Sequence, residues 1–527
     1  MERIKTGRCS VELVVACSCL VAIGMRASGD AKPYPFFEPI QPSRRHQIVV
    51  HGGEANQAPA DSRPALERCI EDGLEWAEVA VRLTRDGQHV LSHADRVSAG
   101  SAQNWAIGER TLSEWKAVDL GSQYSPRYAG ESLLSLREAF ALAKNRLNLC
   151  LDCREVSPEQ LAREILEAGM EHQVVVCDEP VLLKRLDAAS GGRVALMAHW
   201  HPGTDITSWV GSNHLSAVAI EVSKVTADVN RAFQALGVKV QVQNAGSSDT
   251  AENWDKAIRA GADWLQTDLP EELMAHRLWQ QLKVRPVRFS LHRGANRYAP
   301  ENTLPAFTKG IRLGADFEEF DVRTTLDGKY YLLHNDTLDG KTDGSGPIAT
   351  TASSVIDSLS AGSKFGKPYA AIKLPTLDQF LGVVAGKVDL YFDAKAITPE
   401  ALAESITRHG LDERTVVYQS PEYLLRLKAI NPKIRALPPL RSAGELDGLL
   451  SKLHPYAVDA DWDLLSRTLI ARCHAQGILV FSDALGKHER IEDYLQAIDW
   501  GIDVIQTDHP LRLFRAMELQ NAGAVKL

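Results

Sequence analysis

The chain has 527 residues, which is enough for two or more domains or for one very large domain. Its composition, 44% hydrophobic and 24% charged residues, is that of an ordinary soluble globular protein. The formal net charge of -9 argues against a surface that binds nucleic acid or an anionic membrane.

The first segment of the chain has the three-part plan of a secretory signal peptide. A basic stretch, MERIKTGR, precedes the mostly apolar CSVELVVACSCLVAIG, and small residues follow at Ala27 and Gly29. The apolar run is short for a membrane span. We therefore expect residues 1–29 to be an export signal, with the protein secreted or periplasmic and membrane association confined to this segment. The alternative is an unstructured cytoplasmic tail.

Five cysteines follow this leader, namely Cys69, Cys150, Cys153, Cys177 and Cys473. An odd number leaves at least one free thiol. Cys150 and Cys153 have the spacing of a redox or zinc pair, but strand residues three apart face opposite sides, and no second pair follows. We expect these cysteines to be buried structural residues.

The remainder of the chain repeats itself. QIVVHGG echoes VRFSLHRG, WAEVAVRLTRDGQHVLSHAD echoes FEEFDVRTTLDGKYYLLHND, and ADWLQTDLP echoes IDVIQTDHP. His51 and His93 are 42 residues apart, and so are His292 and His334. An offset of 241 residues between His51 and His292 is too long for a solenoid repeat and predicts a duplicated domain.

Each copy alternates short apolar runs with helical stretches such as LAREILEAGM and RIEDYLQAIDWG. This alternation over roughly 240 residues is typical of an eight-stranded parallel α/β barrel. We predict two tandem (β/α)8 TIM-type barrels at residues 45–283 and 287–527, with the polar residues at the carboxyl ends of the strands.

The second copy concentrates charged residues at the ends of three apolar runs, RFSLH, FEEFDV and KYYLLH. Glu319 and Asp321 are two residues apart in a predicted strand, so both point to one face. Two such carboxylates repel each other unless a cation or a shared proton lies between them. His292, Arg293 and His334 add proton-transfer groups and a guanidinium that can bind phosphate.

HRG, PENT, GAD, E-x-D-V, T-x-D-G and a strand ending in histidine, followed by LPTLDQFL, YFDAK and VIQTDHP, resemble the glycerophosphodiester phosphodiesterase family over about residues 287–513. The resemblance implies a barrel with a divalent cation. The sequence departs from the family at Asp393, where the third acidic ligand is usually glutamate. Lys341 stands near the place of a missing arginine, and Phe481–Asp483 replaces a tryptophan–threonine pair, which leaves the substrate's identity open.

The roles implied for the second copy follow the chemistry of phosphodiester hydrolysis, in which negative charge gathers on the phosphoryl group. Acidic side chains would hold the cation, basic side chains would neutralise the phosphate, and two histidines would serve as general base and general acid in an order that the sequence does not fix. Oxygen ligands favour Ca2+ or Mg2+ over zinc. The predicted metal ligands are Glu319, Asp321, Asp393 and Glu301, the phosphate-binding residues are Arg293 and Lys395, and the catalytic residues are His292 and His334.

The first copy has lost part of this set. Gly52 stands in place of the arginine, and Ala60 and Ala80 stand in place of two acids. Glu78 and Asp152 remain as its acidic candidates. We therefore expect a degenerate, non-catalytic barrel that binds Ca2+ or Mg2+ poorly.

These observations predict a divalent-metal-dependent hydrolase that cleaves glycerophosphodiesters, as small-molecule substrates, to glycerol 3-phosphate and an alcohol. Two alternatives remain open at this point. One is a non-catalytic protein that binds phosphodiesters or glycans, and the other is a phospholipase-type activity on lipid head groups.

Overall fold

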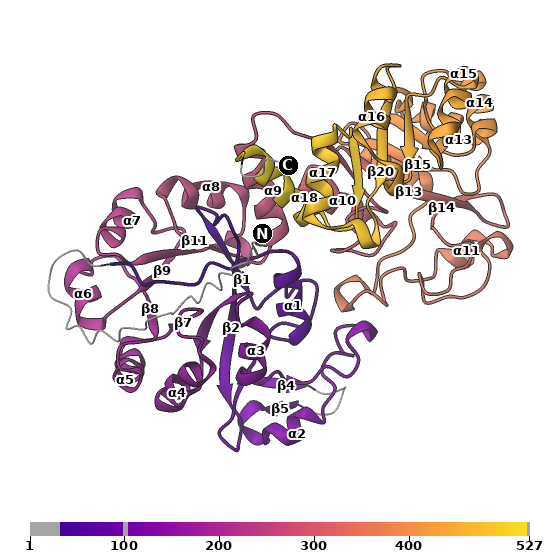
Figure 1. Cartoon of the computed structure of the whole chain (residues 1–527). Helices are drawn as coiled ribbons and strands as arrows, with labels where there is room; N and C mark the ends of the chain where they lie inside the picture. The colour runs from indigo at the N-terminus through magenta and orange to yellow at the C-terminus, as the bar shows by residue number, and fades with distance from the viewer. Residues whose placement is uncertain (1–31, 99–103, 524–527) are drawn as a thin grey trace, which may run out of the picture.

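The computed structural model describes residues 32–98 and 104–523, and it contains two barrels of parallel strands surrounded by helices (Figure 1). The predicted signal peptide, residues 1–29, lies outside the described residues. Within the described part of the chain, no helix has the length and apolar character needed to cross a membrane.

The first barrel is closed, because β1 pairs in parallel with both β2 and β11. Two further strands form a separate antiparallel hairpin, β4 (Arg96–Ser98) with β5 (Asn104–Ala106). A short strand, β3 (His89–Leu91), runs antiparallel to β2 outside the ring. The eight parallel strands are β1 (Gln47–His51), β2 (Trp76–Leu83), β6 (Asn148–Cys153), β7 (Val174–Cys177), β8 (Ala195–His199), β9 (Ala217–Glu221), β10 (Lys239–Gln243) and β11 (Trp264–Thr267).

Helices follow these strands and cover the outside of the ring (Figure 1). Most begin at a residue whose side chain accepts a backbone N–H of the first turn, as Ser62 does from Ala65. The helices are α1 (Arg63–Glu71), α2 (Leu112–Lys116), α3 (Leu136–Ala143), α4 (Pro158–Ala168), α5 (Pro180–Ser190), α6 (Ile206–Asn213), α7 (Ala227–Gln234), α8 (Ala251–Ala260) and α9 (Pro270–Gln281).

The second barrel has the same plan, except that one strand position of the ring is divided into two short strands. Pro438, which has no N–H to donate, separates β17 from β18; β17 pairs with β16, and β18 pairs with β19. β14 (Tyr330–Leu332) lies antiparallel to β13, outside the ring. The ring strands are β12 (Arg288–Leu291), β13 (Phe317–Thr324), β15 (Asp389–Asp393), β16 (Thr415–Tyr418), β17 (Arg435–Leu437), β18 (Pro439–Leu440), β19 (Ala457–Ala460), β20 (Leu479–Asp483) and β21 (Val504–Thr507). The helices are α10 (Leu304–Leu313), α11 (Ser353–Ile356), α12 (Leu377–Val384), α13 (Pro399–Arg408), α14 (Pro421–Ile430), α15 (Leu446–Lys452), α16 (Arg467–His474), α17 (Ile491–Trp500) and α18 (Pro510–Asn521). The predicted pair of TIM-type barrels is confirmed.

The interior of each ring is filled with side chains, so neither barrel is a pore. In the first barrel, Trp76 and Trp264 lie with their ring centroids 4.4 Å apart, and Phe36 packs edge-on against both. In the second barrel, Phe317 and Phe481 form a similar contact at 5.3 Å. These side chains fill the rings, while polar residues occupy the carboxyl ends of the strands.

The two barrels share an extensive interface built around α9. Trp279 of α9 stacks on Phe289 of β12 and contacts Phe514 of α18 edge-on, with centroids 6.0 Å and 5.3 Å away. Arg297 of the second barrel pairs with Asp72 of the first barrel at 2.9 Å, and the Asp72 side chain is 1% exposed. The hydrophobic core is continuous across this interface.

The five cysteines beyond the leader are all buried and free in the described structure, as expected of structural residues. Burial raises the pKa of Cys150 and of Cys153 well above the usual thiol range. A protonated, inaccessible thiol is a poor nucleophile and a poor metal ligand.

Candidate active site

The predicted acidic residues of the second barrel lie on two neighbouring strands. Glu319 and Asp321 project from β13, and Asp393 is the last residue of β15. In the register of this strand pair Asp321 lies directly opposite Asp393. Side chains opposite each other on parallel strands share one face, so this register brings the carboxylates together.

The three carboxylates form a tight, buried cluster. Their oxygen atoms lie within 4.8 Å of one another, and Glu319 and Asp321 are 3% and 1% exposed. Burial, together with the neighbouring Asp321, raises the pKa of Glu319 well above its usual range. Burial also raises the pKa of Asp393 to about 6, although Lys395 partly offsets the effect. Such a cluster is unfavourable without a positive partner.

One oxygen of this cluster is buried without a hydrogen bond from any residue that the structure describes, and it lies 3.6 Å from the ammonium of Lys395. Asp321 Oδ1 is buried and has no hydrogen-bond partner within the described structure, whereas Asp321 Oδ2 accepts a bond from Asn302 at 2.9 Å. Buried polar atoms in proteins are almost always satisfied. The orphaned oxygen, in a set of three carboxylates, fits an oxygen-coordinated divalent cation.

Two cationic side chains flank the carboxylates. The backbone N–H of Arg293 donates to Glu319 at 2.8 Å, and its guanidinium lies 3.4 Å from Asp321. Lys395 lies 2.5 Å from Asp393 and 3.6 Å from Asp321. Burial lowers the pKa of Lys395, but the adjacent Asp393 outweighs it, so the net shift is upward and the ammonium stays charged.

Glu301 is not part of the three-carboxylate cluster. One of its oxygens pairs with Arg293 at 3.2 Å and the other with Lys341 at 2.8 Å. Both oxygens therefore face cations of the protein, and the role of Glu301 as a metal ligand stays a prediction. Lys341 does lie beside the site, where the sequence suggested it would stand in for a missing arginine.

The two predicted catalytic histidines follow β12 and β14, the two strands that pair with β13 besides β15. His292 follows β12, and its Nδ1 is 2.9 Å from Asp508. His334 follows β14, which turns back along β13 so that Leu333 N–H donates to the carbonyl of Asp321. Burial lowers the pKa of His334. The antiparallel return of β14 explains how a residue outside the ring reaches the site.

The set of site residues predicted from the sequence omitted three contributors. Asp508 closes the last strand and orients His292; the repeated TD pair at both strand ends was its only signal. Asp483, at the end of β20, is half-buried, and this burial raises its pKa to about 6 despite the nearby His292. Arg127, from the first barrel, lines a cavity of about 450 Å³ together with Glu301 and Lys341 of the second barrel. Contacts between barrels leave no local pattern in a sequence.

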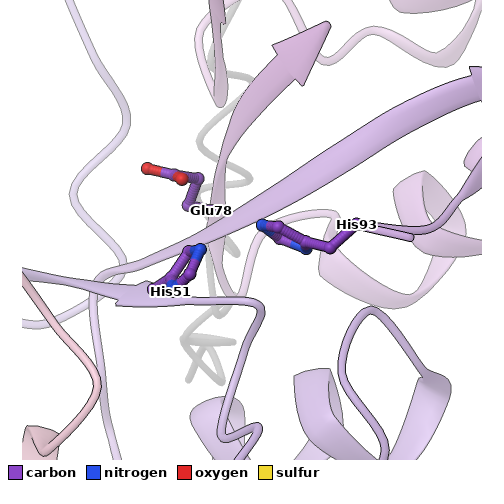
Figure 2. Close-up of side chains that lie close together, drawn as sticks. All are labelled: His51, Glu78 and His93. Carbon is purple, nitrogen blue, oxygen red and sulfur yellow. The ribbon is translucent and has the colours of Figure 1, made fainter. Parts of the chain in front are cut away.

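The corresponding site of the first barrel is arranged differently from the prediction. We expected Glu78 and Asp152 as its paired acids, but Asp152 forms an ion pair with Arg154 at 2.5 Å. Glu78 instead clusters with His51 and His93 (Figure 2). Burial raises the pKa of Glu78 to about 7, although His51 lowers it. A cavity of about 480 Å³ opens beside His51 and Glu78.

Comparison with known proteins assigns the second barrel. Residues 292–512 match the Glycerophosphoryl diester phosphodiesterase family. A glycerophosphodiester phosphodiesterase of Caldanaerobacter subterraneus subsp. tengcongensis is 28% identical over 229 residues, covering 42% of this chain and 93% of the relative. One of Bacillus subtilis is 28% identical over 244 residues, covering 42% and 82%. The crystal structure of glycerophosphodiester phosphodiesterase from Agrobacterium tumefaciens str. C58 is 28% identical with a TM-score of 0.41, covering 44% of this chain and 99% of that chain. By the family match and the sequence relatives, residues 292–512 form a domain of the glycerophosphoryl diester phosphodiesterase family.

Proposed function

We propose that the second barrel hydrolyses glycerophosphodiesters to glycerol 3-phosphate and an alcohol. The observation that carries this proposal is the buried cluster of Glu319, Asp321 and Asp393, flanked by His292 and His334. The relatives named as glycerophosphodiester phosphodiesterases support the same activity.

In this proposal the three carboxylates hold one divalent cation, Ca2+ or Mg2+, because all of the donors are hard oxygen atoms. Bound there, the cation would supply Lewis-acid stabilisation of the phosphoryl charge. Arg293 and Lys395 lie against the same carboxylates and bind the remaining phosphate oxygens through charge-assisted hydrogen bonds.

We assign His292 as the general base and His334 as the general acid. The carboxylate of Asp508 accepts the Nδ1–H of His292, which leaves Nε2 free and stabilises the ring once it gains a proton. His292 takes the proton of the attacking water, whose oxygen bonds to phosphorus. His334 donates a proton to the oxygen of the departing alcohol as the P–O bond breaks.

The first test of the function is the release of glycerol 3-phosphate from glycerophosphodiesters, with and without a chelator. Glu319→Ala and Asp321→Ala should abolish hydrolysis while far-UV circular dichroism remains unchanged. Full activity of the purified protein after exhaustive chelation would contradict the proposal.

A second test separates the two histidines. His292→Ala and His334→Ala should each lower turnover by about 100-fold or more on a natural diester. A 4-nitrophenyl ester of glycerol 3-phosphate has a leaving group that needs no proton, so the defect of His334→Ala should shrink on it while that of His292→Ala persists. The reverse pattern would exchange the two roles.

We further propose that residues 45–283 and 287–527 are copies of one ancestral barrel and that the first has no diesterase activity. The equal spacing of His51 and Glu78 with His292 and Glu319 supports the duplication. The replacement of the arginine by Gly52 removes a guanidinium that would donate hydrogen bonds to the phosphate, which supports the loss of activity. We also propose that residues 1–29 direct export of the protein.

A further inference from the structure

The first barrel contains a cluster of three side chains that its loss of diesterase residues does not explain. His51 ends β1, Glu78 lies in β2, and His93 follows β3. Their candidate ligand atoms all lie within 4.8 Å of one another. The two imidazole rings meet edge to face with centroids 4.7 Å apart, and Glu78 lies beside them (Figure 2).

Both histidines have one nitrogen engaged and the other available. His51 Nδ1 lies 2.9 Å from Asp268, and His93 Nδ1 lies 2.6 Å from Asp61, which is 1% exposed. A carboxylate on Nδ1 fixes the proton there and leaves a lone pair on Nε2. This carboxylate–histidine arrangement is the usual support of a metal-binding imidazole. His93 Nε2 is buried and has no hydrogen-bond partner in the part of the chain that the structure describes.

The comparison with the second barrel shows how this cluster arises. There, Asn302 donates to Asp321, a residue of the three-carboxylate cluster. At the equivalent positions the first barrel has Asp61 and Ala80. The carboxylate has thus moved from the strand to the neighbouring loop, where it holds His93. The two substitutions together exchange an acidic ligand for an oriented imidazole.

The loss of the arginine also favours the imidazole. A Cβ atom on Gly52 would lie 3.8 Å from His93 Cε1 and 3.4 Å from Ala60 Cβ, so the backbone here approaches the ring closely. In the second barrel the guanidinium of Arg293 extends from this position to Asp321. A guanidinium beside His93 would repel a cation. Its absence leaves the two Nε2 atoms and Glu78 as the groups that face one another.

We propose that the first barrel binds a divalent transition metal of the zinc class through Nε2 of His51, Nε2 of His93 and the carboxylate of Glu78. Two imidazoles and one carboxylate are a common three-residue zinc set that keeps one position open. Imidazole donors favour zinc and its neighbours over Ca2+ and Mg2+. Glu78 Oε2 accepts a hydrogen bond from Gln266 at 2.6 Å, which orients the carboxylate and leaves Oε1 for the metal.

The open position of this metal faces the cavity of about 480 Å³, which His51 and Glu78 line. Arg154 and His199 line the same cavity. A small anionic ligand therefore has room to complete the coordination. The site is separate from the cluster of the second barrel, which consists of three other residues that are all carboxylates.

The test uses the untagged full-length chain carrying Glu319→Ala and Asp321→Ala, so that only the first barrel contributes. Zn2+ affinity is measured by competition with a chromogenic chelator, and Co2+ is used as a spectroscopic probe. We expect one equivalent of either ion, with Co2+ showing the intense visible absorption of a four- or five-coordinate site and no thiolate charge-transfer band.

Variants of the first barrel decide whether this metal is held as proposed. His51→Ala and His93→Ala should each abolish the stoichiometric uptake. Asp61→Asn removes the carboxylate that supports His93 and keeps an oxygen to accept the Ala80 N–H, so it should weaken Zn2+ binding by about 10- to 100-fold. His93→Gln keeps a polar side chain of similar length without an imidazole nitrogen, so it should also lose the uptake, and circular dichroism checks that each variant is folded.

A thiol site is the competing explanation, because Cys177 Sγ lies 3.7 Å from His199 Nε2. Cys177→Ser and His199→Ala should keep the Zn2+ affinity of the parent. The proposal is overturned if the folded parent takes up no Zn2+ or Co2+ at equimolar concentration. It is equally overturned if uptake survives in a folded His51→Ala/His93→Ala protein, or if Cys177→Ser abolishes it.

Discussion

The pair formed by His292 and Asp508 allows a sharp test of how the second barrel positions its base. The His292 side chain is 14% exposed, and its Nδ1 lies 2.9 Å from Asp508 Oδ1. Asn296 also donates to this oxygen. Asp508→Asn keeps the size of the side chain but removes the charge, and its amide NH2, when turned toward Nδ1, would donate a hydrogen bond rather than accept one.

The expected loss follows from the strength of that contact. A hydrogen bond to a charged group contributes about 1.5–3 kcal/mol, and about 1.4 kcal/mol corresponds to a tenfold change in rate. Asp508→Asn should therefore lower kcat by roughly 10- to 150-fold. The loss should be larger if the amide forces the proton onto Nε2, because His292 then cannot act as a base.

The assay is steady-state turnover of a glycerophosphodiester across pH. Loss of the carboxylate removes the acceptor of the His292 Nδ1–H, so kcat should fall across the pH range. Asp268→Asn is the matched control, because Asp268 holds His51 of the first barrel at the same distance of 2.9 Å. If both variants lose turnover equally, or if Asp508→Asn keeps its turnover, the assignment of Asp508 as the positioning residue is wrong.

Three further predictions concern stability and the entrance to the site. Arg297→Ala should destabilise the protein by about 3–5 kcal/mol in chemical denaturation, because it leaves the buried Asp72 without its cation. The carboxyl group of Glu318 is buried without a hydrogen-bond partner among the described residues, and burial raises its pKa well above the usual range. Above its unfolded pKa of about 4.3, Glu318 must therefore take up a proton when the chain folds, and Gln at this position avoids that cost. The free energy of unfolding gained by Glu318→Gln should therefore increase as pH rises, by up to about 1.4 kcal/mol per pH unit. A gain independent of pH would refute this. Arg127, whose guanidinium lies 4.8 Å from the Phe365 ring, should affect substrate capture from the other barrel, so Arg127→Ala should raise KM with kcat unchanged; an unaltered KM would remove it from the entrance.

The sequence predicted the barrels and the carboxylate cluster because both depend on local order. Alternating strands and helices define the ring, and the period of two places Glu319 and Asp321 on one face. The family resemblance implied Asp393 as a third acidic ligand, and the parallel register places it opposite Asp321. These relations follow from spacing along the chain and from the rule that parallel strands end together.

Other features depend on side chains that meet only after folding. Glu301 resembles a ligand in the sequence, but in the structure it lies between Arg293 and Lys341. In the first barrel, Asp61 and His93 are 32 residues apart, and only the closed ring brings them to 2.6 Å. A count of lost acidic residues therefore led only to the prediction of a weakened calcium or magnesium site and did not reveal that Asp61 contacts His93.

In the two proposals made above, one type of barrel presents different metal ligands without a change of fold. The ring fixes where each strand ends, so the residues at these ends occupy nearly constant places whatever their chemistry. With Asp321 and Asn302 on this frame, the local donors are carboxylate oxygens and the favoured ion is hard. In the first barrel, Ala80 offers no ligand at the position of Asp321, and Asp61 in the loop orients the imidazole of His93 instead. The favoured ion is then a softer one of the zinc class. Substitutions at the strand ends of such a barrel can abolish one activity and at the same time complete another site. The residues that are not substituted are already held in place by the same strands.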